Sequence, residues 1–375
     1  MTYLDNGATS FPKPQCVTNA MVCAMETCAN PGRGGYEAAM RGAKTLLQCR
    51  ERAGALFDCQ PEQVVCTTSC THGLNLAIRT LVRPGSRVVI SGFEHNAVTR
   101  PLHLLNANLQ IAGRKLFDPD DTLQQFETAL KRGTDAAVFT HVSNVFGYIL
   151  PVEEMARLCQ KYRVPFVVDC AQSAGMLPVS LKNWGADFIA MPGHKGLLGP
   201  MGTGLLLCGR VPAPLLAGGT GSQSENQKMP DFLPDVGEAG TANVPGIAGL
   251  SAGLDHVRKE GIERIFLREQ QQMRRCATNL EKFGFSVYTG ENQCGTLSFV
   301  PDCGCEEMAE FLAKQGICVR AGLHCAPLAH ESAGTLQTGT VRISFGHTAC
   351  GGQTGSFLSA MEKYRNSAAK TQGEM

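Results

Sequence analysis

The segment formed by residues 186–207 constrains this chain most, because it places a lysine where a buried strand ends. An apolar run over residues 188–191 predicts a short strand, and Gly-His-Lys, a glycine-rich loop and a second apolar strand follow it. Burial disfavours the charged form of a lysine, so we expect Lys195 to present a neutral amine that can condense with an aldehyde. For a lone lysine, a solvated turn residue is the alternative, and the rest of the chain decides between the two.

Strand-like and helix-like segments alternate through the first two thirds of the chain. This alternation predicts an α/β fold with a mostly parallel sheet covered by helices on both faces. Ligands of such sheets bind outside the carboxyl ends of the strands, where Lys195 falls. Strands are predicted over residues 63–67, 87–91, 136–142, 165–169, 188–191 and 203–208, and helices over residues 71–81, 123–131 and 152–162.

The pattern changes in the last third of the chain. Helical stretches near residues 254–280 and 306–315 and strands at 295–300 and 341–345 predict a smaller α+β domain. We therefore expect a large domain over residues 15–254, and a small domain made of residues 1–14 and 255–375. The polar tail over residues 367–375 is expected to fray.

Charge and composition exclude several classes of function. The net charge of +1 provides no basic field for nucleic acid or for an anionic membrane surface. The sequence shows neither an apolar run of membrane-spanning length nor a secretory signal, so we expect a cytoplasmic protein. The seventeen cysteines are scattered without a Cys-x-x-Cys pair, and the closest sets, Cys66/Cys70 and Cys303/Cys305, are weak candidates for metal binding. We expect no metal and mostly buried thiols.

The segment TTSCTHGLN predicts a strand end that runs into a helix. Ser69 or Thr71 can cap this helix, and the free N–H groups and positive dipole end near Cys70 suit a phosphate group. An ordinary helix cap is the alternative interpretation of the same residues.

Further strand ends supply polar groups that suit a pyridine ring. His95 can stack on such a ring, although a loop histidine can also be incidental, and the amide of Asn144 can bond a ring oxygen or a carboxylate. Asp169 ends an apolar strand, where a buried carboxylate needs a cationic partner such as a protonated pyridine nitrogen. Gln172 can reach the phenolic oxygen of the ring. A lysine that can condense with an aldehyde, together with polar groups that suit a pyridine ring, indicates pyridoxal 5'-phosphate (PLP) as cofactor.

The predicted small domain adds a thiol and two arginines. In RAGLHCAP, Arg320 and His324 lie close to Cys325, and cationic neighbours favour the thiolate, which is the nucleophilic form. Arg342 lies in the apolar run VRISF, and its planar fork suits the carboxylate of an amino acid. A structural ion pair is the alternative for Arg342.

These residues together resemble the class V, fold-type I aminotransferase family, and within it the cysteine desulfurase and selenocysteine lyase group. The compact RAGLHCAP loop is similar to the group II branch. The motifs that carry the resemblance span nearly the whole chain: YLDNGAT, NPGRGGYEA, TTSCTHGLNLAI, EHNA, HVSNVFG, DCAQSAG, GHKGLLGPMGTG, EAGTANVPG, RAGLHCAP and VRISFG.

The resemblance implies a role for each candidate residue. It makes Lys195 the Schiff-base lysine and Cys325 the acceptor of sulfur, and these two with His95 form the expected catalytic set. The expected cofactor-binding residues are Cys70, Thr71, His95, Asn144, Asp169, Gln172, His194, Lys195 and Thr241. The expected substrate-binding residues are Asn144, Arg320 and Arg342.

Three positions complete what the resemblance implies. Thr241 matches a position that reaches the phosphate of the neighbouring subunit, which implies a homodimer with shared active sites. Pro192 stands where many relatives have a serine that contacts the phosphate, so backbone N–H groups or Ser69 are expected to substitute. His72 stands where an acidic residue is frequent.

The resemblance implies an L-cysteine desulfurase that forms alanine and leaves a persulfide on Cys325 for an acceptor thiol or protein. The alternative is a selenocysteine lyase or another PLP-dependent C–S lyase; a transaminase would not need Cys325, and a PLP-binding protein without catalysis would not need the full set. The sequence leaves open whether the sulfur serves iron–sulfur cluster assembly, thiolated tRNA or another product.

Overall fold

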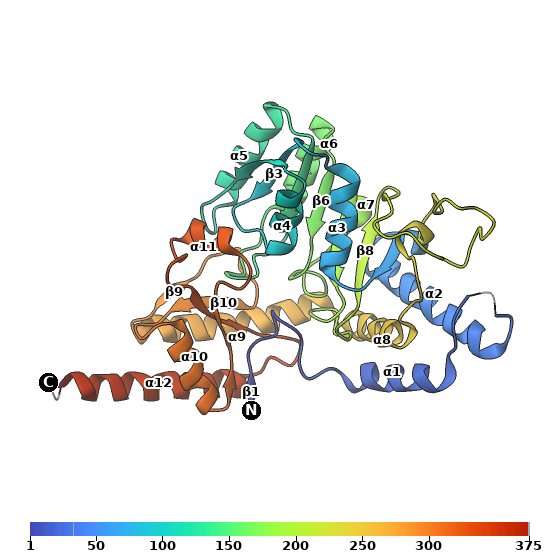
Figure 1. Cartoon of the computed structure of the whole chain (residues 1–375). Helices are drawn as coiled ribbons and strands as arrows, with labels where there is room; N and C mark the ends of the chain where they lie inside the picture. The colour runs from blue at the N-terminus through green and yellow to red at the C-terminus, as the bar shows by residue number, and fades with distance from the viewer. Residues whose placement is uncertain (33, 374–375) are drawn as a thin grey trace.

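A seven-stranded sheet lies at the centre of the fold (Figure 1). The computed structural model describes residues 1–32 and 34–373. The strands of this sheet are β2 (Val64–Thr67), β3 (Arg87–Ser91), β4 (Asn108–Ala112), β5 (Ala136–Thr140), β6 (Phe166–Asp169), β7 (Phe188–Pro192) and β8 (Gly204–Cys208). Their order is β2-β8-β7-β6-β5-β3-β4, and β8 is antiparallel to both of its neighbours while the other pairs are parallel.

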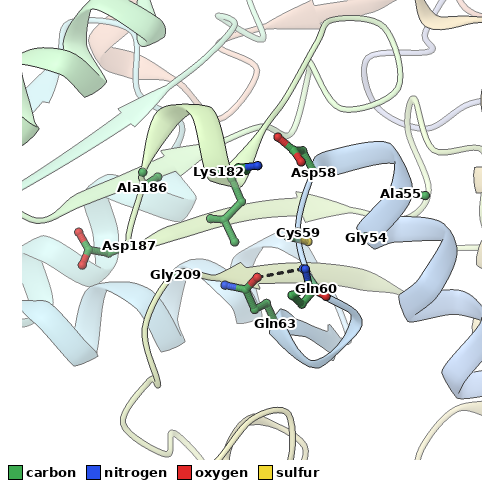
Figure 2. Close-up of a pocket in the computed structure, with 12 residues that line it drawn as sticks. Gly54, Ala55, Asp58, Cys59, Gln60, Gln63, Lys182, Ala186, Asp187 and Gly209 are labelled. Carbon is green, nitrogen blue, oxygen red and sulfur yellow. Dashed lines mark hydrogen bonds between the residues drawn. The ribbon is translucent and has the colours of Figure 1, made fainter.

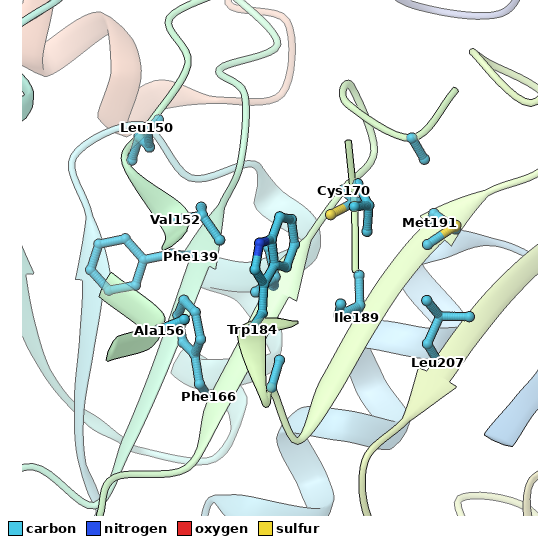
Figure 3. Packing of buried hydrophobic residues seen from close by; sticks show 14 of the residues in the cluster. Phe139, Leu150, Val152, Ala156, Phe166, Cys170, Trp184, Ile189, Met191 and Leu207 are labelled. Atoms are coloured by element: carbon cyan, nitrogen blue, oxygen red, sulfur yellow. The ribbon is translucent and has the colours of Figure 1, made fainter. Parts of the chain in front are cut away.

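Buried side chains alternate between the two faces of this sheet, as the period of a strand requires. In β7, Ile189 and Met191 belong to one apolar cluster, whereas Phe188 and Ala190 belong to the other. Figure 3 shows the first cluster around Trp184. The second cluster is completed by α3 (Cys70–Leu81) and α4 (Asn96–Leu104), and the first by α2 (Glu37–Phe57), α5 (Pro119–Lys131), α6 (Val152–Tyr162), α7 (Leu181–Trp184) and α8 (Val244–Glu260).

The predicted α/β fold with a mostly parallel sheet between helices is confirmed. Each predicted strand of this part overlaps an observed one, and the helix predicted over residues 152–162 coincides with α6. The sequence analysis predicts neither the edge strand β4 nor the helices α1 (Gln15–Thr27), α2, α4 and α7. Within the described residues, no helix is both long and apolar enough to cross a bilayer.

A second, antiparallel sheet is built from the last third of the chain. Its strands are β9 (Ser286–Tyr288), β10 (Thr296–Val300), β12 (Arg320–Gly322) and β13 (Thr340–Ser344), in the order β12-β13-β10-β9. Phe299, Leu312 and Phe357 belong to its apolar core. The helices α9 (Ile262–Lys282), α10 (Cys305–Lys314) and α12 (Gly351–Gly373) contribute to the same core, whereas α11 (Pro327–Ala333) packs against the central sheet through Ala329.

The first residues of the chain lie against this second sheet and not against the first. The short strand β1 (Thr2–Tyr3) pairs in parallel with β11 (Ile317–Cys318), and Asp5 forms an isolated bridge with Ser344. This pairing carries the polar segment that follows β1 toward β12 and β13.

The helical stretch predicted over residues 254–280 is two helices. Gly261, with φ of 89°, separates α8 from α9, and residue 254 lies within α8. We therefore propose Gly261 as the junction between the two parts of the chain. The tail that was expected to fray is helical through Gly373, and residues 374–375 lie outside the described residues.

Candidate active site

One cavity collects the predicted site residues, with the exception of Thr241. Its volume is about 300 Å³. Thr241 is exposed in the loop before α8, away from this cavity. The predicted residues that line the cavity are Cys70, Thr71, His95, Asn144, Asp169, Gln172, His194, Lys195, Arg320, Cys325 and Arg342.

The cavity lies at the carboxyl ends of the parallel strands. Asp169 is the last residue of β6, Pro192 is the last residue of β7, and Thr140 is the last residue of β5. The second sheet closes the other side through Arg320 in β12 and Arg342 in β13. The central sheet therefore places the residues expected to hold the cofactor, and the antiparallel sheet places Arg320 and Arg342, two of the three residues expected to hold the substrate.

Lys195 and Asp169 both line the cavity, where Asp169 is buried and Lys195 is half-buried. Burial lowers the pKa of Lys195, and this effect exceeds the opposing attraction of Asp169. Asp169 is 2% exposed, and its Oδ1 accepts hydrogen bonds from the N–H of Ala171 at 2.8 Å and the thiol of Cys70 at 3.4 Å. The amine is thus shifted toward the neutral form that attacks an aldehyde carbon.

His95 is the N-cap of α4, and this role fixes which nitrogen carries its proton. Its Nδ1 accepts a hydrogen bond from the N–H of Ala97 at 3.0 Å. Burial lowers the pKa of His95, so the ring is neutral with its proton on Nε2. The Nε2–H group therefore remains available to a ligand in the cavity.

The start of α3 supplies backbone donors to the cavity. Ser69 caps this helix, because its Oγ accepts from the N–H of His72 at 3.1 Å. Thr71, the other candidate cap, lies within the first turn. Cys70 and Thr71 both line the cavity, so the unpaired N–H groups of the first turn suit an anion there.

His194 and Gln172 contribute hydrogen-bonding groups without charge. Burial lowers the pKa of His194 to about 4, so the ring is neutral near pH 7. The carbonyl oxygen of His194 accepts from the side chains of Thr9, Ser10 and Lys13. Gln172 Nε2 donates to the carbonyl oxygen of Gly7 at 3.0 Å, which ties the N-terminal segment to the cavity wall.

Arg342 is buried in an ion pair, as the alternative interpretation of the sequence predicts. One of its terminal nitrogens donates to Asp5 Oδ1 at 2.9 Å and the other to the carbonyl oxygen of Asn144 at 2.9 Å. The side chain is only 3% exposed. Two donors of five are thus engaged, and the planar fork keeps N–H groups for a ligand carboxylate.

The loop that carries Cys325 is held by its backbone oxygens. Asn96 N–H donates to the carbonyl oxygen of Cys325 at 2.7 Å, and Asn144 Nδ2 donates to that of His324 at 2.7 Å. His324 and Cys325 both adopt positive φ, at 49° and 57°. This left-handed pair, unusual for residues with side chains, presents the Cys325 thiol to solvent at the cavity.

The expected cationic surroundings of Cys325 are only partly present, and the expectation is wrong for His324. Burial beside Arg342 lowers the pKa of His324 to about 2, so this ring is neutral. Its Nε2 donates to the carbonyl oxygen of Thr340 at 3.1 Å. Arg320, the other expected cation, is paired with Asp5. The sequence could not show that the histidine is buried.

Comparison with known proteins places this chain in a family. A family model described as Aminotransferase class-V matches residues 2–353. This chain belongs to the class-V aminotransferase family. A probable cysteine desulfurase of Methanothermobacter thermautotrophicus is 33% identical over 363 residues, covering 91% of this chain and 89% of the relative. A cysteine desulfurase of Escherichia coli O157:H7 is 33% identical over 353 residues, covering 87% of this chain and 84% of that relative.

A solved structure agrees with this assignment. The apo structure of a cysteine desulfurase from Thermococcus onnurineus NA1 is similar with a TM-score of 0.89 and 30% sequence identity. The match covers 97% of this chain and 94% of that one. The predicted fold-type I architecture is therefore confirmed.

Class-V enzymes of this kind depend on PLP, and the donor set of this class-V chain fits that cofactor. The cavity offers a lysine amine shifted toward neutrality, a buried carboxylate for a pyridinium nitrogen and helix N–H groups for a phosphate. His194 Nδ1 is buried without a hydrogen-bond partner among the described residues, which leaves a further polar atom for a ligand. Pro192 is buried in β7, so Ser69, Cys70 and Thr71 remain the candidates for the phosphate.

Two acidic residues near the site were missed by the sequence interpretation. Asp5 lies within the motif YLDNGAT but received no role, because its arginine partners are more than 300 positions away. Glu94 precedes His95 and is 0% exposed. Its Oε1 accepts hydrogen bonds from the N–H groups of Ser91 and Thr140 and from the Ser91 hydroxyl, and Oε2 has no partner among the described residues.

We expect Glu94→Gln to change how stability depends on pH. Burial raises the pKa of Glu94 to about 8 from its usual 4.5, so the folded chain holds a proton that the unfolded chain releases between these values. The stability contributed by this proton is complete below the unfolded pKa and is lost as pH rises toward the folded pKa. The wild type should therefore lose about 2 kcal/mol of unfolding free energy relative to Glu94→Gln between about pH 6 and about pH 7.5.

Denaturant titrations of both proteins at the two pH values provide the measurement. Glu225→Gln, at an exposed glutamate, is the matched control, and its free energy of unfolding should equal that of the wild type at both pH values. A difference between wild type and Glu94→Gln that does not change with pH would contradict a protonated Glu94.

A larger hollow lies at the opposite end of the central sheet (Figure 2). Asp187 precedes β7 and Gly209 follows the antiparallel β8, so both lie at the end away from Lys195. The hollow is about 750 Å³ and is lined by the end of α2 and the residues that follow it, by the start of α7, and by the segment between α7 and β7. None of its lining residues belongs to the predicted site.

The cysteines and acidic groups show no sign of a metal centre in the described part of the chain. No group of three or more His, Cys, Asp or Glu side chains there is arranged to hold an ion. Each of the seventeen cysteines is a free thiol. Burial raises the pKa of Cys70 well above its usual range, so this thiol is a neutral donor to Asp169.

Proposed function

We propose that this chain is a PLP-dependent cysteine desulfurase that converts L-cysteine to L-alanine and transfers the sulfur atom to Cys325. The observation that carries the proposal is that an exposed thiol and a lysine amine shifted toward neutrality line the same cavity. The relatives named cysteine desulfurase support the same activity.

PLP, when bound, supplies an electron sink that makes the Cα proton of an amino acid acidic. Lys195 would hold the aldehyde group of PLP, and its free amine would accept the Cα proton of the substrate. Asp169 would keep the pyridine nitrogen protonated. His95 would stack on the pyridine ring of PLP, with its Nε2–H group free to donate to a ligand. The first turn of α3 would hold the phosphate of PLP.

The second sheet would bind the substrate and take its sulfur. Arg342 would bind the substrate carboxylate through its free N–H groups, beside the Asn144 side chain. The Cys325 thiolate would attack the substrate sulfur, forming an S–S bond while the C–S bond breaks. The electron pair of the C–S bond returns to carbon, which is protonated to the methyl group of alanine. An acceptor thiol, on a small molecule or a partner protein, would then remove the persulfide sulfur.

We further propose that the enzyme is a homodimer with shared active sites. Thr241 lies outside the cavity of its own chain and is exposed, as a residue that serves a neighbouring subunit would be. Exposed apolar side chains on α1 and α2 support an interface there: Val22, Met25, Met40 and Leu47 are 48–70% exposed. The seventeen free thiols support a reducing compartment, the cytoplasm.

The products formed from L-cysteine test the proposed reaction. With PLP and dithiothreitol present, we expect alanine and sulfide in equal amounts, because sulfur leaves to a thiol and carbon is protonated. An eliminating C–S lyase would form pyruvate and ammonia with the sulfide, and that result would overturn the proposal. L-selenocysteine, assayed in parallel, tests the selenocysteine lyase alternative by its relative rate of alanine formation.

A further inference from the structure

Two arginines face each other across adjacent strands at the substrate end of the cavity. The antiparallel register of β12 and β13 pairs Arg320 directly with Arg342. Like charges directly opposite one another in a sheet are destabilising. This pair therefore needs a counter-charge, and neither strand supplies one.

Asp5 supplies that charge from the other end of the chain. Its Oδ1 accepts from Arg342 at 2.9 Å, and its Oδ2 accepts from a terminal nitrogen of Arg320 at 2.7 Å. Arg320 Nε donates to both carboxylate oxygens, at 3.2 and 3.1 Å. The pairing of β1 with β11 and the bridge from Asp5 to Ser344 hold the carboxylate in this position.

The two arginines are restrained to different degrees. The side chain of Arg342 is 3% exposed and is also held by the carbonyl oxygen of Asn144. The side chain of Arg320 is 51% exposed, and each hydrogen bond described for it ends on Asp5. Loss of the Asp5 charge would therefore leave Arg342 in place and release Arg320.

The net charge of Asp5, Arg320 and Arg342, here called the triad, is balanced by one ligand carboxylate. Two guanidinium groups and one carboxylate sum to a single positive charge next to the cavity. One carboxylate of a bound amino acid neutralises that charge, and a second carboxylate would find no free cation among these three residues. The triad thus fits an amino acid with an uncharged side chain.

We propose that Asp5 is a positioning residue that sets substrate selectivity by occupying Arg320, so that the cavity accepts amino acids with one carboxylate and rejects those with two. This inference rests on the proposed function, because it assigns the substrate carboxylate to Arg342. Asp5 acts through the two arginines and does not itself line the cavity.

The test compares how the PLP-loaded enzyme binds L-alanine and L-aspartate, which differ by one carboxylate. Dissociation constants come from titrations that follow the absorbance of the cofactor. In Asp5→Asn, the released Arg320 can bind the second carboxylate, so the ratio of the aspartate constant to the alanine constant should fall by about tenfold or more. Asp5→Glu restores the charge and should keep the ratio closer to that of the wild type.

Asp302→Asn is the matched control. Asp302 pairs with Arg365 at the same 2.7 Å as Asp5 with Arg320, but it lies outside the cavity lining, so its loss should leave the ratio unchanged. An Asp5→Asn protein that folds, binds PLP and keeps the wild-type ratio would overturn the proposal.

A second variant makes the test independent of whether Asp5→Asn folds. Arg320→Gln removes an arginine that, in this proposal, is already paired with Asp5. The ratio of the aspartate to the alanine dissociation constant should therefore stay within about twofold of the wild-type ratio. A tenfold rise in the ratio would overturn the proposal, because Arg320 would then already bind the second carboxylate. Wild-type alanine formation from cysteine is measured separately, so failure of the proposed reaction is distinguishable from failure of the role of Asp5.

Discussion

Lys195→Ala should lower turnover of L-cysteine by about 10³-fold or more, because the proposed function gives one amine the tasks of holding the cofactor and moving the Cα proton. Burial lowers the pKa of this lysine, and Asp169 only partly offsets the effect. The variant should also lose the absorbance of covalently attached PLP while keeping its fold. Turnover assays and absorbance spectra of the purified variant check both expectations.

Lys182→Ala is the matched control for this variant. Lys182 is an exposed lysine that lines the hollow at the opposite end of the sheet, so its loss should change neither spectrum nor rate. A Lys195→Ala protein that retains covalent PLP or near-normal turnover would contradict the assignment of Lys195.

Cys325→Ala should lower alanine formation from L-cysteine by about 10²-fold or more while PLP binding stays normal, because the variant lacks the thiol that we propose as the acceptor of the sulfur. The loop around this residue is held through the backbone oxygens of Cys325 and His324, which accept hydrogen bonds from Asn96 N–H and Asn144 Nδ2, and not through the thiol. The substitution should therefore leave the loop and the cavity intact.

Cys16→Ala and Cys350→Ala serve as controls, since both thiols are exposed and neither lines the cavity. Both variants should match the wild type in alanine release from L-cysteine. Unchanged alanine release by Cys325→Ala would contradict sulfur transfer to this residue and would favour a lyase that expels the sulfur directly.

The central sheet was predictable because its strands are short, apolar and bounded by polar residues. The strand that ends at Asp169 is buried at every position, and an uninterrupted apolar run of this kind is a clear signal. The edge strand β4 has exposed residues at its first two positions, which blurs the pattern. The helix α4 contains Pro101, a residue that argues against a helix in sequence alone.

The residues of the site were predictable as types, but their charge states and partners were not. Lys195, Asp169 and Cys325 lie in recognisable local motifs, so the sequence sufficed to select them. The pairing of Asp5 with Arg320 and Arg342 depends on contacts between the two ends of the chain. The neutrality of His324 depends on its burial beside Arg342. Both are properties of the folded chain, which no local pattern contains.

The mass of the peptide that contains Cys325 shows directly whether this residue receives the sulfur. The PLP-loaded wild type is mixed with one equivalent of L-cysteine in the absence of any reducing thiol. The protein is then alkylated and digested, and the masses of its peptides are measured by mass spectrometry. We predict one added sulfur atom on Cys325, formed together with alanine and removed by dithiothreitol. Alanine formation with no sulfur on Cys325, or with the sulfur on another cysteine, would contradict sulfur transfer to Cys325.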